Sequence, residues 1–424
     1  MHALLVTVGS AGDVHPFVGL GRALTGRGHR ATLVTNAYFE PLARRAGLEF
    51  IDSSPDGKFY SVLNNPHVWH RFRGFGIIMR EAVLPLLRPI YDIVAEHAGP
   101  DTVVVASSLA LGARIAQEKL RVPLATVHLA PAVFRTDYDG PRLPGAALGA
   151  RVPVALKRLQ YWLADRVVID RILAPAVNGF RAELGLPTQR RLLKDWWNSP
   201  QLVLGAFPEW FAPPQPDRPP QTVLTGFPLY DEGDLGEPSD EVREFIAAGG
   251  PPIAFTPGSA NVHGREFFAV AVEACHRLGR RGVLLTRFPD QLPANLPNTV
   301  RHFDFVPFGW LLPRSAAVVH HGGIGSTAQG LAAGVPQLLM PLGFDQFDNA
   351  ARIERLGCGD WLPLRRFTAA NVTAVLARLL ESPSVAEACR RTASLSRGQR
   401  ALTAMCEAIE RLGSATQRAI PGVA

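Results

Sequence analysis

The sequence predicts an α/β protein made of two doubly wound domains with parallel sheets. Three observations support this prediction. Short apolar runs alternate with helical patterns along the whole chain, the order that produces parallel sheets covered by helices. The runs are continuously apolar, so the strands should be buried on both faces. The chain has 424 residues, enough for two or three domains of about 150 residues each.

The expected strands form two sets of five, one in each half of the chain. The first set comprises residues 3–8, 31–35, 102–106, 123–127 and 202–206. The second set comprises residues 253–256, 282–286, 299–303, 316–320 and 337–340.

The segment between the two sets predicts the domain boundary. Residues 213–220 read PPQPDRPP, and the fixed φ angles and missing amide donors of proline predict a stiff extended connector. We therefore expect an N-terminal domain over 1–212, a connector region over 213–241 and a C-terminal domain over 242–400. A helix and tail over 401–424 could pack back on the N-terminal domain.

The two domains begin with similar segments. Residues 4–10 read LLVTVGS and residues 253–259 read IAFTPGS, each a strand that ends in T-x-G-S. A glycine at the carboxyl end of a strand lets the backbone turn tightly toward a ligand crevice. Two such domains facing each other would leave a cleft between them.

Composition excludes several classes of protein. The net charge of +7 comes from dispersed arginines, whereas nucleic-acid binding needs a concentrated basic patch. The four cysteines form no CxxC pair, so we expect neither a zinc site nor a disulfide framework. The longest apolar runs have about ten residues, half of a membrane span. The first residues lack a basic region and a cleavage site, so we expect no signal peptide and a cytoplasmic protein.

The most informative segment is VVHHGGIGSTAQGLAAGVPQLLMPLGFDQFDNA, residues 318–350. A strand that ends at His320 is followed by glycines and then by a short Ala-rich helix, which is the arrangement of a phosphate site. His321 could donate to the same anion. Asp345 and Gln346 follow the next strand, and a carboxylate beside an amide suits vicinal hydroxyls. The alternatives are glycines that serve only packing, and a solvated turn at Asp345.

This pattern resembles a known family. H-G-G-x-G-S/T, then G-V-P, then D-Q-x-x-N-A is similar to the donor signature of family 1 glycosyltransferases, which have the two-Rossmann GT-B fold. The N-terminal GSAGDVHPF resembles the loop of bacterial members that glycosylate antibiotics, sterols and lipids. MHALLVTVGSAGDVHPFVGLGRAL, FPEWFAPPQ and TGFPLYD further resemble the rhamnosyltransferases of rhamnolipid synthesis.

The resemblance implies roles for residues that match the donor motif. His321, Gly323, Gly325, Ser326 and Thr327 would contact phosphate, and Ser259 would lie near the diphosphate. Phe305 would stack on uracil or thymine, with the Val306 backbone pairing with that base. Asp345 and Gln346 would bind sugar hydroxyls. Two positions depart from the family: Gln329 replaces a frequent glutamate for the ribose, and Phe308 replaces a frequent glutamine.

The loop over residues 9–16 should carry the acceptor chemistry. An acceptor hydroxyl needs a general base within hydrogen-bond reach, and Asp13 follows the first strand and two glycines. His15 is the rival base. Asp13 could also serve as a helix N-cap. The resemblance favours Asp13 as a lone base, because the position of the acid that partners a histidine base in plant members is Ser107 or Ser108 here.

Aromatic residues in the first half are candidates for the acceptor site: Phe59, Trp69, Phe72, Phe75 and Phe134. Pro66, Gly74 and Gly76 interrupt the region, which predicts a loop rather than a helix. Residues 152–180 form a longer helical pattern with apolar positions on one face. That face is either core or an apolar surface with a basic rim, suited to a lipophilic acceptor or a membrane.

Together these features predict an inverting glycosyltransferase that moves a hexose from a UDP- or dTDP-sugar to a hydroxyl of a lipophilic acceptor. The resemblance suggests rhamnose and a hydroxy fatty acid. We expect no cofactor, no metal and no nucleic-acid partner, and a cytoplasmic location with peripheral contact at the inner face of the membrane. The D-x-D at 137–139 lacks the strand context of a metal site. The alternatives are a nucleotide-sugar-modifying enzyme of the same fold and a non-catalytic subunit that binds a nucleotide sugar or lipid.

Overall fold

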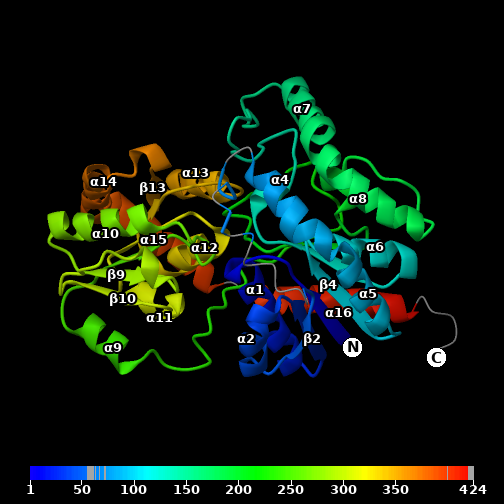
Figure 1. Cartoon of the computed structure of the whole chain (residues 1–424), viewed down its shortest axis with the longest axis horizontal. Coiled ribbons are helices and arrows are strands. Elements are labelled where there is room, and N and C mark those ends of the chain that lie inside the picture. The colour runs from blue at the N-terminus through cyan, green and yellow to red at the C-terminus, as the bar shows by residue number, and fades with distance from the viewer. Residues whose placement is uncertain (55–61, 63, 66, 71–72, 399, 419–424) are drawn as a thin grey trace. The chain divides into compact units, whose positions relative to one another are not determined.

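The computed structural model describes the chain except for residues 55–61, 63, 66, 71–72, 399 and 419–424. The chain divides into two compact units, each with its own sheet (Figure 1). Unit 1 comprises residues 1–9, 13–228 and 400–424, and unit 2 comprises residues 10–12 and 229–399. The division after residue 228 lies inside the expected connector region.

Unit 1 contains a seven-stranded parallel sheet in the order β3-β2-β1-β4-β5-β6-β7. The chain builds outward from β1 to β3, returns to the other side of β1 with β4, and continues to β7. The β1/β4 pair is therefore the point where the strand order reverses. The strands are β1 (His2–Val6), β2 (Arg30–Thr35), β3 (Glu49–Asp52), β4 (Thr102–Ser107), β5 (Leu124–His128), β6 (Leu202–Gly205) and β7 (Thr222–Leu224).

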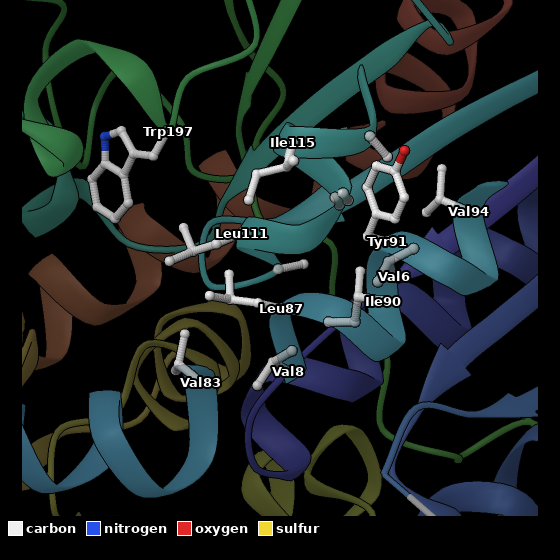
Figure 2. Close-up of a cluster of buried hydrophobic side chains, with 14 of the residues drawn as sticks. Val6, Val8, Val83, Leu87, Ile90, Tyr91, Val94, Leu111, Ile115 and Trp197 are labelled. Carbon is white, nitrogen blue, oxygen red and sulfur yellow. The ribbon is translucent and has the colours of Figure 1, made fainter. Parts of the chain in front are cut away.

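Helices cover both faces of this sheet because its strands are apolar on both sides. Leu4, Val6 and Val104 belong to one core. Helices α5 and α6 complete this core with side chains such as Ile90 and Leu111 (Figure 2). The helices of unit 1 are α1 (Ala11–Gly26), α2 (Glu40–Arg45), α4 (Gly74–Ile78), α5 (Leu87–His97), α6 (Leu111–Leu120), α7 (Val154–Leu163), α8 (Asp170–Glu183) and α16 (Ala401–Arg418).

The last helix, α16, belongs to unit 1. It contacts β4 and β6, and its Gly413 lies against Val103, whose side chain points to the opposite face from Val104. Glu410 fixes the helix to the turn before β2. Its Oε1 lies 2.7 Å from Arg27 Nε and 2.9 Å from His29 Nε2. The Arg27 hydrogen bond is the main reason that the pKa of Glu410 falls to about 2.

Unit 2 contains a six-stranded parallel sheet in the order β10-β9-β8-β11-β12-β13. Its strand order reverses at the β8/β11 pair. The strands are β8 (Ile253–Thr256), β9 (Gly282–Leu285), β10 (Val300–Phe303), β11 (Ala317–His320), β12 (Gln337–Leu339) and β13 (Gly359–Trp361).

Alternate residues of β8 belong to separate cores on the two faces of this sheet. Ile253 and Phe255 pack with α10 and α14, whereas Ala254 packs with α9 and α11. The helices of unit 2 are α9 (Asp240–Ala247), α10 (Arg265–Leu278), α11 (Phe308–Leu311), α12 (Ile324–Ala333), α13 (Gln346–Leu356), α14 (Ala369–Glu381) and α15 (Pro383–Arg397).

The ten strands expected from the sequence are confirmed, with ends that differ by at most two residues. One expectation, a loop around Gly74 and Gly76, is wrong. The segment 74–78 is helical, because Gly74 and Gly76 are buried inside α4 instead of ending it. The helical pattern over residues 152–180 forms α7 and α8, and the two interpretations of its apolar face divide between them. Leu173, Val177 and Phe180 of α8 are buried in the core, whereas Leu156 and Trp162 of α7 are 45% and 49% exposed. No helix in the described part of the chain has both the length and the hydropathy to cross a bilayer.

Each unit has a buried histidine as the last residue of a strand. His128 of β5 has its Nδ1 2.7 Å from Ser108 Oγ and its Nε2 2.7 Å from Asn198 Oδ1. His320 of β11 accepts from the Gly322 amide at Nδ1 (3.0 Å) and lies 2.9 Å from Gln337 Oε1 at Nε2. Burial lowers the pKa of both imidazoles to about 4.

We predict that the free energy of unfolding decreases as the pH falls from about 6.5 to about 4. Each of these histidines stays neutral in the folded state and becomes protonated in the unfolded state over this range, so each contributes a slope of about 1.4 kcal/mol per pH unit. Urea unfolding at several pH values measures this slope. Replacing the exposed His276 with Gln should leave the slope unchanged, and a flat profile above pH 4.5 would contradict the assignment.

Candidate functional site

The residues predicted to bind the donor follow the carboxyl ends of four strands of the parallel sheet in unit 2. Ser259 follows β8, Phe305 follows β10, His321 follows β11, and Asp345 and Gln346 follow β12. Because parallel strands share one carboxyl edge, the sheet collects these residues along that edge. The edge at a reversal of strand order is where open α/β sheets bind ligands, and Ser259 and His321 follow the two strands of the β8/β11 reversal.

The N-terminus of α12 provides an anion site beside β11. Gly323 is its N-cap, and the first intrahelical bond runs from the Thr327 amide to the Gly323 carbonyl, 3.0 Å. The amides of residues 323–326 precede that bond, so they remain available at the positive end of the helix dipole. Ser326 is partly exposed, whereas Thr327 is fully buried. The expected Thr327 contact with phosphate stays a prediction.

His321 lies between two glycines of unit 2. A Cβ on Gly258 would lie 2.6 Å from His321 Cε1, and a Cβ on Gly323 would lie 2.5 Å from His321 Nε2. The imidazole therefore requires both glycines, and Gly258 also has a φ of +97°. Burial, followed by the neighbouring His320, lowers the pKa of His321 to about 3. Its buried Nδ1 has no hydrogen-bond partner among the described residues, so a ligand could satisfy it.

His320 positions the glycine loop and is a residue that the sequence analysis did not assign. Its Nδ1 accepts from the Gly322 amide, so its proton lies on Nε2 and is donated to Gln337. The Gln337 amide in turn donates to the Thr327 carbonyl, 3.3 Å. The first histidine of the HH pair, His320, was the available signal in the sequence for this buried network.

The start of α13 holds the residues predicted to bind the sugar. Gln346 Oε1 accepts from the amides of Leu342 (2.7 Å) and Gly343 (3.1 Å), so this oxygen holds the loop. Asn349 Nδ2 lies 2.8 Å from Asp345 Oδ2 and 2.9 Å from the Gly322 carbonyl. Asn349 thus ties the sugar loop to the glycine loop. The sequence analysis gave Asn349 no role, although it belongs to the D-Q-x-x-N-A pattern.

Phe305, predicted to stack on the base, is 39% exposed at this edge. The Arg287 guanidinium lies over its ring at 5.6 Å, which leaves the ring supported by a cation–π contact. The neighbouring Val306 side chain is buried and anchors the segment, while Gln329 is partly exposed on α12.

Asp13 lies in the first turn of α1, directly after the carboxyl end of β1. The helix begins at Ala11, so most of the expected loop over residues 9–16 is helical, Asp13 lies inside the helix, and the N-cap interpretation is wrong. A Cβ on Gly9 would lie 2.1 Å from Asp13 Oδ2, which shows that the carboxylate packs directly over the Gly9 backbone. The Thr7 hydroxyl donates to the Asp13 carbonyl, 3.1 Å. His15, the rival base, is partly exposed on the same helix.

A hydrogen-bonded chain follows β4, the strand beside β1. Ser107 Oγ accepts from the Val8 amide, 3.3 Å. Ser108 Oγ contacts His128 Nδ1, and His128 Nε2 contacts Asn198 Oδ1. The asparagine oxygen can only accept, so the His128 proton lies on Nε2 and Ser108 donates to Nδ1. The sequence analysis missed this chain because its members lie far apart in the sequence.

The aromatic acceptor candidates do not form one cluster in the described structure. Phe59 and Phe72 lie outside the described residues. Trp69 packs against a small cluster that includes Val62 and Val68, and Phe75 packs at the edge of the large core of unit 1. Phe134 lies edge-on to His128, with ring centroids 4.8 Å apart. Phe134 therefore contacts the Ser108–His128–Asn198 chain through His128.

The D-x-D segment is engaged in structural contacts. Asp137 Oδ2 lies 2.6 Å from Arg158 Nε, and the Asp139 amide donates to Gln215 Oε1, 3.2 Å. Among the described residues, no group of three or more His, Cys, Asp and Glu side chains could hold a metal ion.

Comparisons with known proteins agree with this arrangement. Residues 3–136 match the glycosyltransferase family 28 N-terminal domain, and residues 284–409 match the erythromycin biosynthesis protein CIII-like C-terminal domain. The chain is 33% identical to an O-mycaminosyltylonolide 6-deoxyallosyltransferase of Streptomyces fradiae, over 97% of both chains. It is 29% identical to a sterol 3-beta-glucosyltransferase of Pichia angusta over 84% of this chain, but spans only 29% of that protein.

Solved structures share the fold. A glycosyltransferase of kitacinnamycin superposes with a TM-score of 0.73 at 21% identity, covering 97% of this chain and 98% of that one. A spinosyn rhamnosyltransferase complexed with thymidine diphosphate gives a TM-score of 0.69 at 18% identity, covering 97% and 100%. With these relatives and two parallel-sheet units, the chain belongs to the GT-B glycosyltransferases, in the family of the antibiotic and sterol glycosyltransferases.

Proposed function

We propose that this glycosyltransferase moves a hexose from a UDP- or dTDP-sugar to a hydroxyl of a lipophilic small molecule, with inversion at the anomeric carbon. The observation that carries the proposal is the anion site at α12, where amides at a helix N-terminus lie beside the His321 side chain. The buried Nδ1 of His321 has no hydrogen-bond partner among the described residues. A diphosphate would satisfy both.

In the proposed reaction, the donor diphosphate binds to the amides of residues 323–326. With a pKa of about 3, His321 is neutral at physiological pH and donates one hydrogen bond without adding charge. Negative charge grows on the leaving phosphate as the anomeric C–O bond breaks. Preorganised amides and the helix dipole stabilise that charge in the transition state.

Asp13 acts as the general base in this proposal. Its carboxylate takes the proton of the acceptor hydroxyl while the oxygen attacks the anomeric carbon opposite the diphosphate. One C–O bond forms, one breaks, and the nucleoside diphosphate leaves. The single displacement inverts the anomeric centre through an oxocarbenium-like transition state. The packing of the carboxylate over Gly9 supports this role, because it limits the positions that the base can adopt.

The finer substrate assignment rests on resemblance. Motifs shared with rhamnosyltransferases of rhamnolipid synthesis support rhamnose as the sugar and a hydroxy fatty acid as the acceptor. The names of the relatives, which include sterol and deoxyallosyl transferases, support a lipophilic acceptor and a deoxyhexose. We propose further that the enzyme needs no cofactor and works in the cytoplasm, in contact with the inner face of the membrane.

The direct test is release of nucleoside diphosphate from a panel of UDP- and dTDP-sugars, with and without hydroxy fatty acids, sterols and phenolics. Release that requires an acceptor supports transfer. Conversion of the nucleotide sugar without an acceptor would instead indicate a nucleotide-sugar-modifying enzyme. Binding without turnover would indicate a non-catalytic subunit.

Replacing Asp13 with Asn should lower turnover by about 10²–10⁴, the range for loss of a positioned general base. The amide keeps the shape that packs over Gly9, so donor affinity should change little. Steady-state kinetics and donor titration measure the two effects. His15→Gln is the matched control and should retain turnover within a few-fold; the opposite ranking of the two variants would make His15 the base.

Replacing His321 with Ala should weaken binding of both the free nucleoside diphosphate and the nucleotide sugar, because the side chain is assigned to phosphate. Replacing Asp345 with Ala should weaken only the intact nucleotide sugar. Isothermal titration with both ligands separates these outcomes. Equal losses for both ligands in the Asp345 variant would remove its assignment to sugar hydroxyls.

Catalytic efficiency should rise with the alkyl length of the acceptor, because burial contributes about 0.8 kcal/mol per methylene. Replacing Trp69 with Ala should reduce kcat/KM most for long-chain acceptors and leave slow donor hydrolysis intact. Kinetics on a homologous series of hydroxy acids measure this trend. Preference for small polar alcohols would contradict an apolar acceptor site.

A further inference from the structure

Helix α7 (Figure 1) and the π-helical turn after it, Ala164–Ile169, are adjacent along the chain. Together they carry an unusual concentration of exposed apolar side chains. Of the fourteen large hydrophobic side chains exposed in the described structure, seven lie between Val154 and Val168. They are 42–54% exposed and include Leu159 and Trp162. We call these seven residues the apolar stripe. Exposed hydrophobic residues that occur singly are ordinary, whereas such a concentration along one segment indicates an interaction site.

The helix is held with its polar side inward. Lys157 is 1% exposed and donates to the carbonyls of Asp137 (2.9 Å) and Tyr138. Asp165 is 2% exposed and forms ion pairs with Arg135 at 2.6 Å and Arg191 at 3.4 Å. Unpaired burial of either charge would be costly, so these contacts fix the rotation of the helix. The apolar stripe therefore faces solvent as a consequence of how the buried charges are paired.

The exposed charges within this segment are arginines, and one of them, Arg158, pairs with Asp137 of the neighbouring segment, where Asp139 is also exposed. All residues from 151 to 171 are described, and the exposed charged ones are Arg151, Arg158, Arg166 and Arg171. The two acids of this segment, Asp165 and Asp170, are buried or partly buried, and Asp170 accepts from the amides of residues 191 and 192. The Arg166 guanidinium lies 5.9 Å from the Trp162 ring. An apolar face with an arginine rim and an interfacial tryptophan is the pattern of a helix that lies in a bilayer surface.

We propose that the apolar stripe and its arginine rim dock this protein on an anionic lipid bilayer. The acyl boundary would cover Leu156, Leu159 and Trp162, and anionic headgroups would meet the arginines. A second copy of the chain fits less well, because a two-fold contact through this face would bring Arg151, Arg166 and Arg171 of both copies together, and no acid within residues 151–171 is exposed to pair with them. Docking requires neither donor nor acceptor, so it is independent of the proposed transfer reaction.

Flotation of the full chain with vesicles tests the proposal. Binding should be tighter to phosphatidylcholine vesicles with roughly 30% phosphatidylglycerol than to phosphatidylcholine alone, and should weaken with added salt. The double variant Arg151→Glu/Arg166→Glu should lose at least about 25-fold in partitioning, about fivefold for each arginine. The double variant Leu159→Ser/Trp162→Ser should lose at least about tenfold.

Matched changes elsewhere on the surface serve as controls. Leu364 and Leu395 are exposed by 56% and 45%, and their double Ser variant should bind vesicles like the unmodified protein. The double variant Arg280→Glu/Arg301→Glu changes two exposed positions of unit 2. Its partitioning to vesicles should fall far less than that of Arg151→Glu/Arg166→Glu. Circular dichroism and thermal unfolding check that every variant is folded.

Two results would overturn the proposal. Vesicle binding that is equal in the stripe variants and the unmodified protein would place the membrane contact elsewhere. Absence of vesicle binding would reject a lipid bilayer as the partner of the apolar stripe. Light scattering that showed a dimer of the unmodified protein, and no dimer of the Leu159→Ser/Trp162→Ser variant, would then identify a second copy of the chain as the partner.

Discussion

Parallel pairing of strands is the constraint on which both candidate sites depend. In each unit, all strands run in one direction, so their carboxyl ends share an edge and residues distant in sequence meet there. In unit 2 this edge brings Ser259, His321 and Asp345 together, and in unit 1 it places Asp13 beside the β1/β4 reversal. The chemistry at each edge then depends on backbone space, since Gly9 and Gly258 leave room for Asp13 and His321.

The sequence was sufficient for the central strands and for the residues that follow them, because strands buried on both faces have continuous apolar runs. It was insufficient for β3, β7 and β13. These three strands lie at sheet edges, where most of their residues are partly exposed, so their sequences mix polar and apolar residues. The motif H-G-G-x-G-S located the anion site. It did not predict that Thr327 is fully buried or that Gln346 Oε1 accepts hydrogen bonds from backbone amides, because both features depend on the tertiary fold.

Helix α7 shows why periodicity can mislead. Its apolar positions repeat as in a core helix, and a core helix normally turns that face inward. Here Lys157 and Asp165 occupy the inner face, and their partners Asp137, Arg135 and Arg191 come from other segments. Those partners could not be assigned from α7 alone. The Ser108–His128–Asn198 chain escaped prediction for the same reason, since its three members come from separate parts of the chain.

The position of α16 has a consequence for biosynthesis. Unit 2 is almost entirely one stretch of chain, residues 229–399, whereas unit 1 needs residues from both sides of it. Met405, Cys406 and Ile409 of α16 are buried, and the ribosome makes them after all of unit 2. At synthesis rates of roughly 5–20 residues per second, unit 1 waits roughly 10–35 s for this helix. During that interval the face of the sheet that α16 contacts is incomplete, so the nascent chain offers chaperones an apolar surface that the finished protein lacks.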